Sequence, residues 1–256
     1  MLLKNKVYII VGAASLRGIG YAVIDLFAKH GARLVAVDVQ MSADLALTIQ
    51  QAVNTAHSIS ADIMGIKCDI ADRLSCQEMI EKVMEKFGRI DGLVNCAAIV
   101  QSKSIIDINE SDFDRMININ LKGIFNLLQA CLPQLQNQGS GSIVNVASVA
   151  AQRGGGLVGG AHYAASKGGV ISLTKTVARE FGQYGVRANT VCPSMTETGM
   201  IDGMTREQYE AIVSSIPLRR AGHASDIAGA CLFLSSDLSA YVTGATLDVN
   251  GGSHIH

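Results

Sequence analysis

Short apolar runs rich in valine and isoleucine alternate with longer amphipathic stretches along the whole chain. This alternation is typical of repeated βα units that build a parallel sheet. Seven runs have the length and composition of strands: Val7–Val11, Arg33–Val37, Ile63–Cys68, Gly92–Asn95, Ser142–Ala147, Arg187–Val191 and Thr246–Val249. We therefore predict a single α/β domain over residues 1–256, with a doubly wound seven-stranded parallel sheet and helices on both of its faces.

The composition suits a buried sheet and excludes several classes of protein. Hydrophobic residues make up 48% of the chain and charged residues 17%, as expected for strands covered on both faces. The formal net charge of -1 provides no basic field for nucleic acid or for an anionic membrane. No apolar run approaches the roughly 18 residues of a membrane span, and the N-terminal segment runs straight into a strand rather than to a cleavage site. We expect a cytoplasmic protein that binds neither nucleic acid nor membrane.

The cysteines and histidines predict neither a disulfide framework nor a metal site. The six cysteines are scattered without a CxxC pair, and the six histidines form no cluster with the spacing of metal ligands. We expect reduced thiols in the core. His254 and His256 could reach a partner or a metal, but frayed terminal residues are the simpler interpretation.

Small and polar residues follow the predicted strands at their carboxyl ends, namely Gly12, Asp38, Asp69, Asn95, Ser148 and Pro193. Open α/β sheets bind their ligands at this edge. The turn after the first strand, GAASLRGIG from Gly12 to Gly20, leads into a helical pattern. Glycines let a backbone approach a pyrophosphate, whose charge is favoured at a helix N-terminus. The usual GxGxxG does not fit because Val23 occupies the third position, so an ordinary strand-to-helix turn is the alternative.

Asp38 lies 18 residues beyond Gly20, near the offset at which an acid binds the adenosine ribose hydroxyls. Arg17 argues for the other nucleotide, since a guanidinium beside the phosphate turn could pair with the 2′-phosphate of NADP. A carboxylate about 4 Å from a phosphate charge costs on the order of 4 kcal/mol at an effective dielectric of 20, whereas an exposed arginine pair returns about 1 kcal/mol or less. We predict NAD over NADP; the alternative is that Asp38 only starts a turn.

Tyr163 and Lys167 lie four residues apart on a helical stretch, hence on one face. This spacing alone is unspecific and fits a surface helix pair equally well. Ser148 strengthens it, because Ser148 ends a strand and a glycine cluster at 153–160 then leads into Tyr163. A phenol has an ordinary pKa near 10, and a nearby ammonium together with an oxidised nicotinamide would lower it. We predict Tyr163 as the acid/base and Ser148 as a hydrogen-bond donor to the substrate oxygen.

Taken in order, these motifs resemble the short-chain dehydrogenase/reductase superfamily over essentially the full length of the chain. The matching segments are Gly18-Ile19-Gly20, Asp38, Cys68-Asp69-Ile70, Asn95-Cys96-Ala97-Ala98, Asn120, Ser148, Tyr163 with Lys167, the run from Pro193 to Thr198, and DIAGACLFLSSDLSAYVTGATLDVNGG near the C-terminus. The resemblance implies a Rossmann fold, a homotetramer and the catalytic set Asn120, Ser148, Tyr163 and Lys167. It also implies that Asn120 anchors a water in a proton relay and that Lys167 binds the nicotinamide ribose.

The resemblance implies a set of cofactor-binding residues as well: Gly12, Ser15, Arg17, Gly18, Ile19, Gly20, Asp38, Asp69, Ile70, Asn95, Ala97, Tyr163, Lys167, Pro193, Thr196 and Thr198. Within this set, Thr198 is expected to contact the nicotinamide carboxamide. The sequence departs from the family at the first glycine turn, where Leu16 and Arg17 are extra residues, so phosphate contacts by Ser15 and Arg17 stay open. The segment from 148 to 163 also looks long, which should reshape the substrate pocket rather than the chemistry.

We predict an NAD-dependent oxidoreductase that transfers a hydride between the nicotinamide and a secondary alcohol or ketone, without a metal. Segments 98–104, 149–162 and 194–217 should set specificity, the last as a mobile lid. Arg153 and His162 could bind a polar or anionic substrate, and a solvated loop position is an equally good interpretation of Arg153. The few aromatic residues and the lack of tryptophan argue against a steroid-sized pocket. The expected substrate is a small polyol, a sugar-like alcohol or a hydroxy acid.

Two other functions stay open. A reductase of 3-oxoacyl thioesters in fatty-acid synthesis looks similar throughout, but that branch usually prefers NADP and needs a basic surface for acyl carrier protein. Asp38 and the near-neutral charge argue against it. A non-catalytic dinucleotide-binding regulator is the second alternative, although it has no need for the four catalytic residues together.

Overall fold

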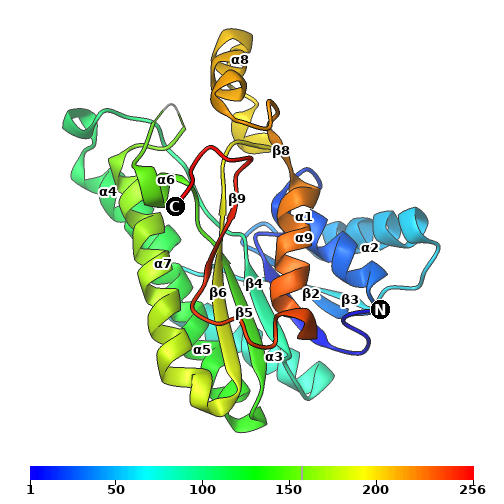
Figure 1. The fold of residues 1–256 in the computed structure, drawn as a ribbon. Helices are drawn as coiled ribbons and strands as arrows, with labels where there is room; N and C mark the ends of the chain where they lie inside the picture. Colours follow the sequence, from blue (N-terminus) through cyan, green and yellow to red (C-terminus); the bar gives the residue numbers. More distant parts are fainter. Residues whose placement is uncertain (157) are drawn as a thin grey trace.

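The computed structural model describes residues 1–156 and 158–256 as a parallel sheet with helices on both faces (Figure 1). The order of its seven strands is β3-β2-β1-β4-β5-β6-β9, and every neighbouring pair is parallel. The strands are β1 (Val7–Val11), β2 (Arg33–Asp38), β3 (Ile63–Lys67), β4 (Gly92–Asn95), β5 (Gly141–Val146), β6 (Val186–Pro193) and β9 (Thr246–Val249). The chain reverses its direction of winding between β1 and β4, and open sheets bind ligands at such a switch point.

The predicted doubly wound seven-stranded parallel sheet is confirmed, with each strand end within two residues of its expected position. β6 extends to Pro193 because its pairing with β9 continues to the contact of Pro193 with Val249. A separate two-stranded sheet of β7 (Thr196–Glu197) and β8 (Gly222–His223) was not predicted. Two-residue strands leave too little alternation in a sequence to be recognised.

Six helices cover the sheet: α1 (Ile19–Lys29), α2 (Ala43–His57) and α9 (Ala224–Ser235) on one face, and α3 (Arg73–Phe87), α5 (Gly123–Gln138) and α7 (Ala161–Phe181) on the other. Successive side chains of a strand point to opposite faces. Accordingly, Ile9 packs in the core beneath α3 and α5, whereas Tyr8 and Ile10 pack in the core beneath α1 and α9. Burial on both faces explains why the strands are apolar throughout.

The shorter elements gather beyond the carboxyl ends of the strands, with a few 3-10 turns elsewhere. They are α4 (Glu110–Ile117), the π turn η2 (Asn118–Lys122), α6 (Ala150–Arg153), α8 (Arg206–Ser215) and the 3-10 turns η1 (Ile105–Asp107), η3 (Gly182–Tyr184), η4 (Gly199–Ile201) and η5 (Asp237–Ser239). α8 projects from the body of the molecule in Figure 1. None of the helices in the described part of the chain combines the length and the apolar composition needed to cross a bilayer.

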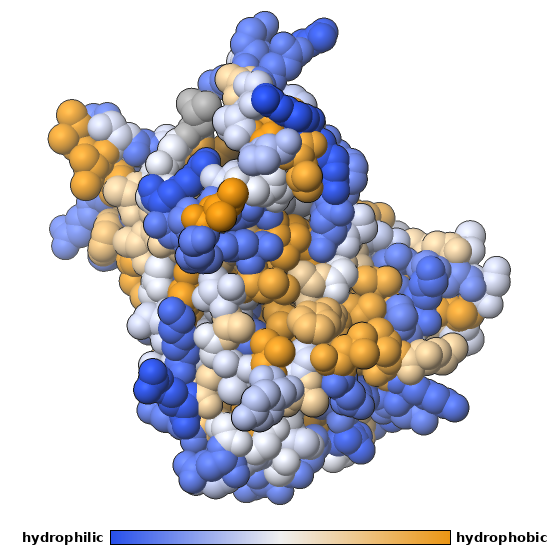
Figure 2. Space-filling model, in the orientation of Figure 1, coloured by the Kyte–Doolittle hydropathy of each residue, from blue (hydrophilic) through white to orange (hydrophobic). Residues whose placement is uncertain are grey.

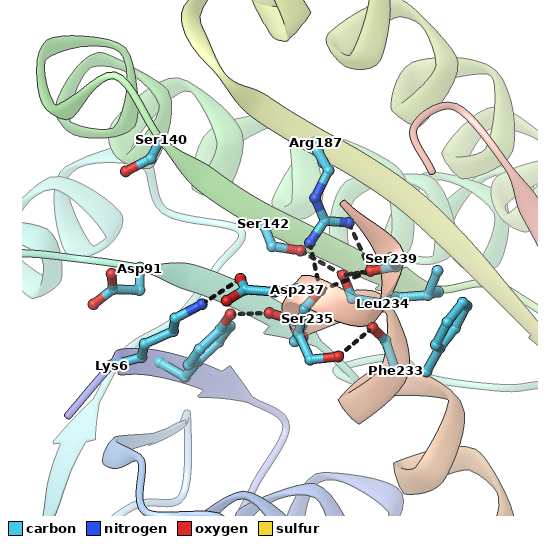
Figure 3. A network of polar contacts seen from close by, with 12 residues as sticks. Lys6, Asp91, Ser140, Ser142, Arg187, Phe233, Leu234, Ser235, Asp237 and Ser239 are labelled. Carbon is cyan, nitrogen blue, oxygen red and sulfur yellow. Dashed lines mark hydrogen bonds and ion pairs between the residues drawn. The ribbon is translucent and has the colours of Figure 1, made fainter. Parts of the chain in front are cut away.

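Tyr8 and Arg187, two polar side chains at the amino ends of the strands, are paired within the protein (Figure 3). Tyr8 Oη donates a hydrogen bond to Ser235 O at 2.5 Å. The half-buried guanidinium of Arg187 donates to Ser239 Oγ at 3.0 Å and to Ser236 O at 3.3 Å. These bonds connect β1 and β6 to the end of α9 and the following turn. The donors of Tyr8 and Arg187 at this end of the sheet are therefore engaged within the protein.

The C-terminal tail is docked on the body of the protein, so the expectation of frayed terminal histidines is wrong. His256 Nε2 lies 3.1 Å from Asp248 Oδ2 and 3.0 Å from Gln152 Nε2. The ring of His254 packs edge-on against that of His256, with 4.7 Å between the ring centroids. The chain end therefore lies beside α6, as Figure 1 shows.

Candidate active site

The glycine turn after β1 is shaped by close backbone approach. Gly12 has φ +83, and a Cβ there would lie 2.6 Å from the nitrogen of Ala97 in the loop after β4. A Cβ on Gly20 would lie 2.3 Å from the oxygen of Gly12. Only glycine fits both positions, so the turn brings the start of α1 directly against the strand ends.

The start of α1 has the properties of an anion site. No side chain caps the helix at Gly18, and the N–H groups of Ile19 and Gly20 donate to no group in the described residues. Free N–H groups and the helix dipole together favour a phosphate. This part of the chain therefore fits the pyrophosphate of a dinucleotide, with Gly18, Ile19 and Gly20 as the residues that would hold it.

Asp38 is the last residue of β2 and lies beside this turn. Its Oδ2 accepts a hydrogen bond from the N–H of Ala14 at 3.1 Å, and its Oδ1 accepts one from the N–H of Gln40 at 3.0 Å. Each carboxylate oxygen therefore keeps further acceptor capacity, and the residue is partly open to solvent. A ribose diol would find two acceptors here.

Arg17 makes a contact that the sequence did not indicate. Its guanidinium pairs with both carboxylate oxygens of Asp202, at 2.8 and 3.0 Å. Asp202 belongs to the expected lid segment 194–217, so this exposed ion pair joins the lid to the glycine turn. The Ser15 carbonyl accepts a hydrogen bond from Gly18 N–H at 2.9 Å. Phosphate contacts by the side chains of Ser15 and Arg17 stay predictions.

Three further predicted cofactor-binding residues, Asp69, Ile70 and Asn95, lie at or just after the ends of β3 and β4. Asp69 is exposed, and its Oδ1 accepts a hydrogen bond from Ala71 N–H at 2.9 Å. Ile70 is buried. Asn95 is fully buried and accepts a hydrogen bond from Ala97 N–H at 3.3 Å. Their contacts with a nucleotide stay predictions, and Asn95 lies within the sheet rather than on an open surface.

A cavity of about 360 Å³ opens at the carboxyl ends of β5 and β6. Seven of the predicted catalytic and cofactor-binding residues line it: Ile19, Ser148, Tyr163, Lys167, Pro193, Thr196 and Thr198. The structure thus brings together three of the four predicted catalytic residues with the nicotinamide end of the predicted cofactor set. Asn120 is not on the cavity wall.

Tyr163 and Ser148 form the reactive pair of the cavity. Tyr163 is buried, which raises the pKa of its phenol, and a hydrogen bond from Ser148 lowers that pKa in part. Because the raising effect is the larger, the groups of the protein hold the phenol protonated at neutral pH. Tyr163 is therefore set up to donate a proton, and it needs an added positive charge nearby to accept one readily.

Lys167 is fully enclosed below Tyr163 on the same helix. Its Nζ donates a hydrogen bond to Val146 O at 2.7 Å and lies 5.9 Å from the centroid of the Tyr163 ring. Burial lowers the pKa of Lys167 to about 8. Lys167 is not among the groups that shift the pKa of Tyr163, which burial raises. The expectation that this ammonium and an oxidised nicotinamide together lower that pKa stays a prediction.

Asn120 acts on the backbone beside the cavity. It lies in the π turn η2, a feature often found at functional sites. Its Oδ1 accepts from Ile99 N–H at 2.9 Å, and its Nδ2 donates to Ile99 O at 2.9 Å. A weaker bond of 3.3 Å reaches Ser166 on α7. The side chain fixes the loop after β4 against the helix that carries Tyr163, and its role in a water relay stays a prediction.

The apolar wall of the cavity was not predicted from the sequence. Six apolar side chains from segment 194–217 contribute to it: Met195, Met200, Ile201, Ala211, Ile212 and Ile216. A signal was present, because α8 begins with the capping box of Thr205 and Gln208, which marks a helix start. The surface of α8 that Figure 2 shows is mostly hydrophilic, and Ala211, Ile212 and Ser215 of this helix line the cavity.

Arg153 and His162, the two residues predicted to bind substrate, occupy different environments: only Arg153 lines the cavity. His162 is buried, its Nε2 lies 2.8 Å from Gln101 Oε1, and it is absent from the cavity wall. It connects α7 to the loop after β4. Arg153, at the end of α6, lines the cavity. Of the two, only Arg153 is placed to meet a substrate.

Comparison with known proteins agrees with this geometry. Residues 12–254 match the family model described as Enoyl-(Acyl carrier protein) reductase. The chain is 45% identical, over the full length of both proteins, to an uncharacterized short-chain type dehydrogenase/reductase of Sinorhizobium fredii. It is 40% identical to a 3-oxoacyl-[acyl-carrier-protein] reductase of Thermotoga maritima, covering 98% of this chain and 99% of the relative. It is 37% identical to a 3alpha-hydroxysteroid dehydrogenase of Mediterraneibacter gnavus, covering 99% and 98%.

A solved structure agrees as well. A short-chain type dehydrogenase/reductase from Mycobacterium ulcerans superimposes with a TM-score of 0.91 at 25% identity, covering 99% of this chain and 91% of the other. The family model spans nearly all of the chain, and the full-length relatives exceed 30% identity. These matches show that the chain, in which Ser148, Tyr163 and Lys167 line one cavity, belongs to the short-chain dehydrogenase/reductase superfamily of nicotinamide-dependent oxidoreductases.

Proposed function

We propose that the protein is an NAD-dependent oxidoreductase that interconverts a secondary alcohol and a ketone. The observation that carries the proposal is the placement of Ser148, Tyr163 and Lys167 in one cavity next to the uncapped start of α1. The bound nicotinamide would supply the hydride donor or acceptor. Every proton transfer would then fall to the side chains of the chain itself.

Tyr163 is the acid in reduction and the base in oxidation. Its phenol, held protonated by burial, donates to the ketone oxygen as that oxygen gains negative charge. Ser148 donates a second hydrogen bond to the same oxygen, and such preorganised donors stabilise a transition state by a few kcal/mol. Lys167, with its pKa near 8, carries positive charge at neutral pH beneath the phenol and would also bind the nicotinamide ribose.

Asp38 supports the choice of NAD. Its two carboxylate oxygens retain acceptor capacity for ribose hydroxyls. The 2′-phosphate of NADP would meet this negative charge and would be repelled. Arg17, the residue that argued for NADP, has its guanidinium paired with Asp202.

The apolar wall narrows the expected substrates. Each hydroxyl of a polyol buried without a partner would cost free energy, and the lid side of the cavity offers aliphatic side chains. Of the polyol, sugar-like and hydroxy-acid classes, the hydroxy acid with an aliphatic body fits best. A 3-oxoacyl-thioester reductase is the second candidate, supported by the apolar wall and the 40% identical relative and opposed by Asp38.

We extend the proposal to the assembly, the lid and the compartment. Phe113 on α4 and Phe125 on α5 are both 45% exposed, and hydrophobic residues also gather over α9 in Figure 2; these surfaces support a homotetramer. The Arg17 to Asp202 pair supports segment 194–217 as a lid over the cofactor. Six free cysteines support a reducing compartment such as the cytoplasm.

The test is a screen that follows NADH and NADPH absorbance with aliphatic hydroxy acids, oxo acids, polyols, sugars and acyl thioesters. We expect turnover of hydroxy or oxo acids with NAD(H) and weak activity with polyols. Turnover restricted to acyl thioesters with NADPH would overturn the proposal in favour of the second candidate.

A further inference from the structure

The charge on the wall of the active-site cavity has one sign only. Among the described residues that line it, the charged side chains are Lys167 and Arg153, and none is an aspartate or glutamate. Most of the remaining wall is aliphatic, so no acidic side chain of the wall neutralises these two charges. A cavity with positive charge and apolar walls favours a ligand that carries a negative group on an apolar body.

The two cations are not equivalent. Lys167 is 2% exposed and is engaged with Val146 O beneath Tyr163. Arg153 lies at the end of α6, on a different helix from Lys167, and is exposed. Of the five N–H groups of its guanidinium, the described chain engages one, which donates to Ser253 O at 3.1 Å. No carboxylate of the described residues lies within 4.0 Å of this guanidinium.

The surroundings hold Arg153 in place. Its own N–H donates to Val149 O at 3.1 Å, which closes the turn of α6. The neighbouring Gln152 donates to Asp248 Oδ1 at 2.8 Å, so α6 is fixed to the end of β9. Asp248, the acid next to α6, is thereby engaged with Gln152 and His256 and does not neutralise Arg153. The docked tail thus positions a guanidinium that has free donors.

We propose that Arg153 is the anion-recognising residue of the substrate pocket and that the substrate is an aliphatic oxo or hydroxy acid whose carboxylate binds there. Arg153 follows Ser148 by five positions across the turn that forms α6, which at a helical rise separates their backbones by about 7 Å. A carboxylate four to six bonds from the carbonyl carbon would span that separation. The inference rests on the proposed oxidoreductase function and specifies its substrate class.

The experiment compares acids with their neutral esters. The probes are 4-oxopentanoate, 5-oxohexanoate and 6-oxoheptanoate, each paired with its methyl ester, and the readout is kcat/KM with NADH. We expect the wild-type protein to prefer the best acid over its ester by about tenfold, as typical for a partly exposed guanidinium–carboxylate contact. In Arg153→Gln this preference should disappear through a higher KM for the acid, with kcat and the ester unchanged.

Two further variants make the result specific. Arg153→Glu should invert the preference, because it places a carboxylate where the anion would bind. Arg179→Gln, an exposed cation on α7 away from the cavity, should keep the wild-type ratio. If the ratio of acid to ester is the same in the wild-type protein and in Arg153→Gln, the inference is wrong although the oxidoreductase function stands.

A binding measurement distinguishes failure of the anion site at Arg153 from failure of the proposed oxidoreductase function. Calorimetric titration of the NADH-loaded protein with the acids needs no turnover. If the acid binds the wild-type protein and not Arg153→Gln while neither acid nor ester is reduced, the anion site is supported and the proposed function fails. Equal binding of acid and ester to both proteins would overturn the anion site regardless of activity.

Discussion

The two ends of the central sheet differ in how far their polar side chains are paired within the protein. At the amino ends, Tyr8 and Arg187 donate to backbone and hydroxyl oxygens around the end of α9 (Figure 3). At the carboxyl ends, the start of α1 lacks a side-chain cap, and Lys167 and Arg153 each have a single donor engaged. Buried polar groups contribute to stability when they are paired within the protein and are available to a ligand when they are not. The difference indicates that one end serves stability and the other serves binding and chemistry.

Ser148→Ala tests the carboxyl end with the largest expected effect. Loss of a hydrogen-bond donor to the reacting oxygen should lower kcat/KM by 10²- to 10³-fold, about 3 to 4 kcal/mol. Stability should change by at most about 2 kcal/mol, because the Ser148 hydroxyl makes two hydrogen bonds within the protein, one with Ala150 N–H and one with Tyr163. Steady-state kinetics and urea unfolding of the same preparation measure both. A large loss of stability with kinetics unchanged would reverse the roles of the two ends.

Asp38→Ser tests the cofactor side of the same end. Removing the carboxylate should lower the preference for NAD over NADP by about 10²-fold, because repulsion of a 2′-phosphate at about 5 to 6 Å is worth on the order of 3 kcal/mol at an effective dielectric of 20. Dissociation constants of NADH and NADPH from fluorescence titration measure the change. An unaltered preference would show that Asp38 only shapes the turn through Ala14 and Gln40.

Arg187→Met tests the amino end. The variant leaves the oxygens of Ser236 and Ser239 without this donor, so we expect a loss of about 2 to 3 kcal/mol in the free energy of unfolding. The specific activity of the folded protein should not change. Urea unfolding at a fixed protein concentration is the measurement, since an oligomer gains stability with concentration. A drop in kcat at unchanged stability would show that the amino end of the sheet contributes to catalysis and would contradict the assigned difference between the two ends.

The pH dependence of oxidation and of reduction tests whether Tyr163 is the group that accepts and donates the proton. Burial raises the pKa of this phenol, so the protonated form predominates at neutral pH. Oxidation needs the deprotonated form, and its kcat/KM should rise about tenfold per pH unit below the pKa. Reduction uses the protonated form and should fall only when the pH exceeds that pKa. Initial rates in both directions across the pH range test this, and parallel profiles would refute it.

Much of the molecule could be predicted from local sequence. The apolar runs located β1, β4 and β9 at their observed bounds, because strands buried on both faces need continuous apolar residues. The reactive residues followed from their positions at strand ends and from the Tyr163 and Lys167 spacing. Local pattern and tertiary structure coincide wherever a βα unit repeats.

The remainder depends on contacts between distant segments. The Arg17 to Asp202 pair joins residues 185 apart in sequence, and the Arg153 to Ser253 bond joins residues 100 apart. No periodicity connects such positions, so the docking of the tail on α6 could not be foreseen. The raised pKa of Tyr163 could not be predicted for a related reason. Burial, its largest cause, depends on the packed structure, whereas the charge of Lys167 can be read from the sequence.

The central claim, that Tyr163 transfers the proton at the open end of the sheet, is tested most directly with Tyr163→Phe. NADH binding by fluorescence titration serves as the control, and alcohol oxidation with NAD is the measurement. We predict that the variant binds NADH as the wild-type protein does and loses oxidation by at least about 10³-fold at neutral pH. At that pH Lys167 carries its proton and is engaged with Val146 O, and no carboxylate or imidazole is among the described residues that line the cavity. Oxidation at the wild-type rate would contradict the account.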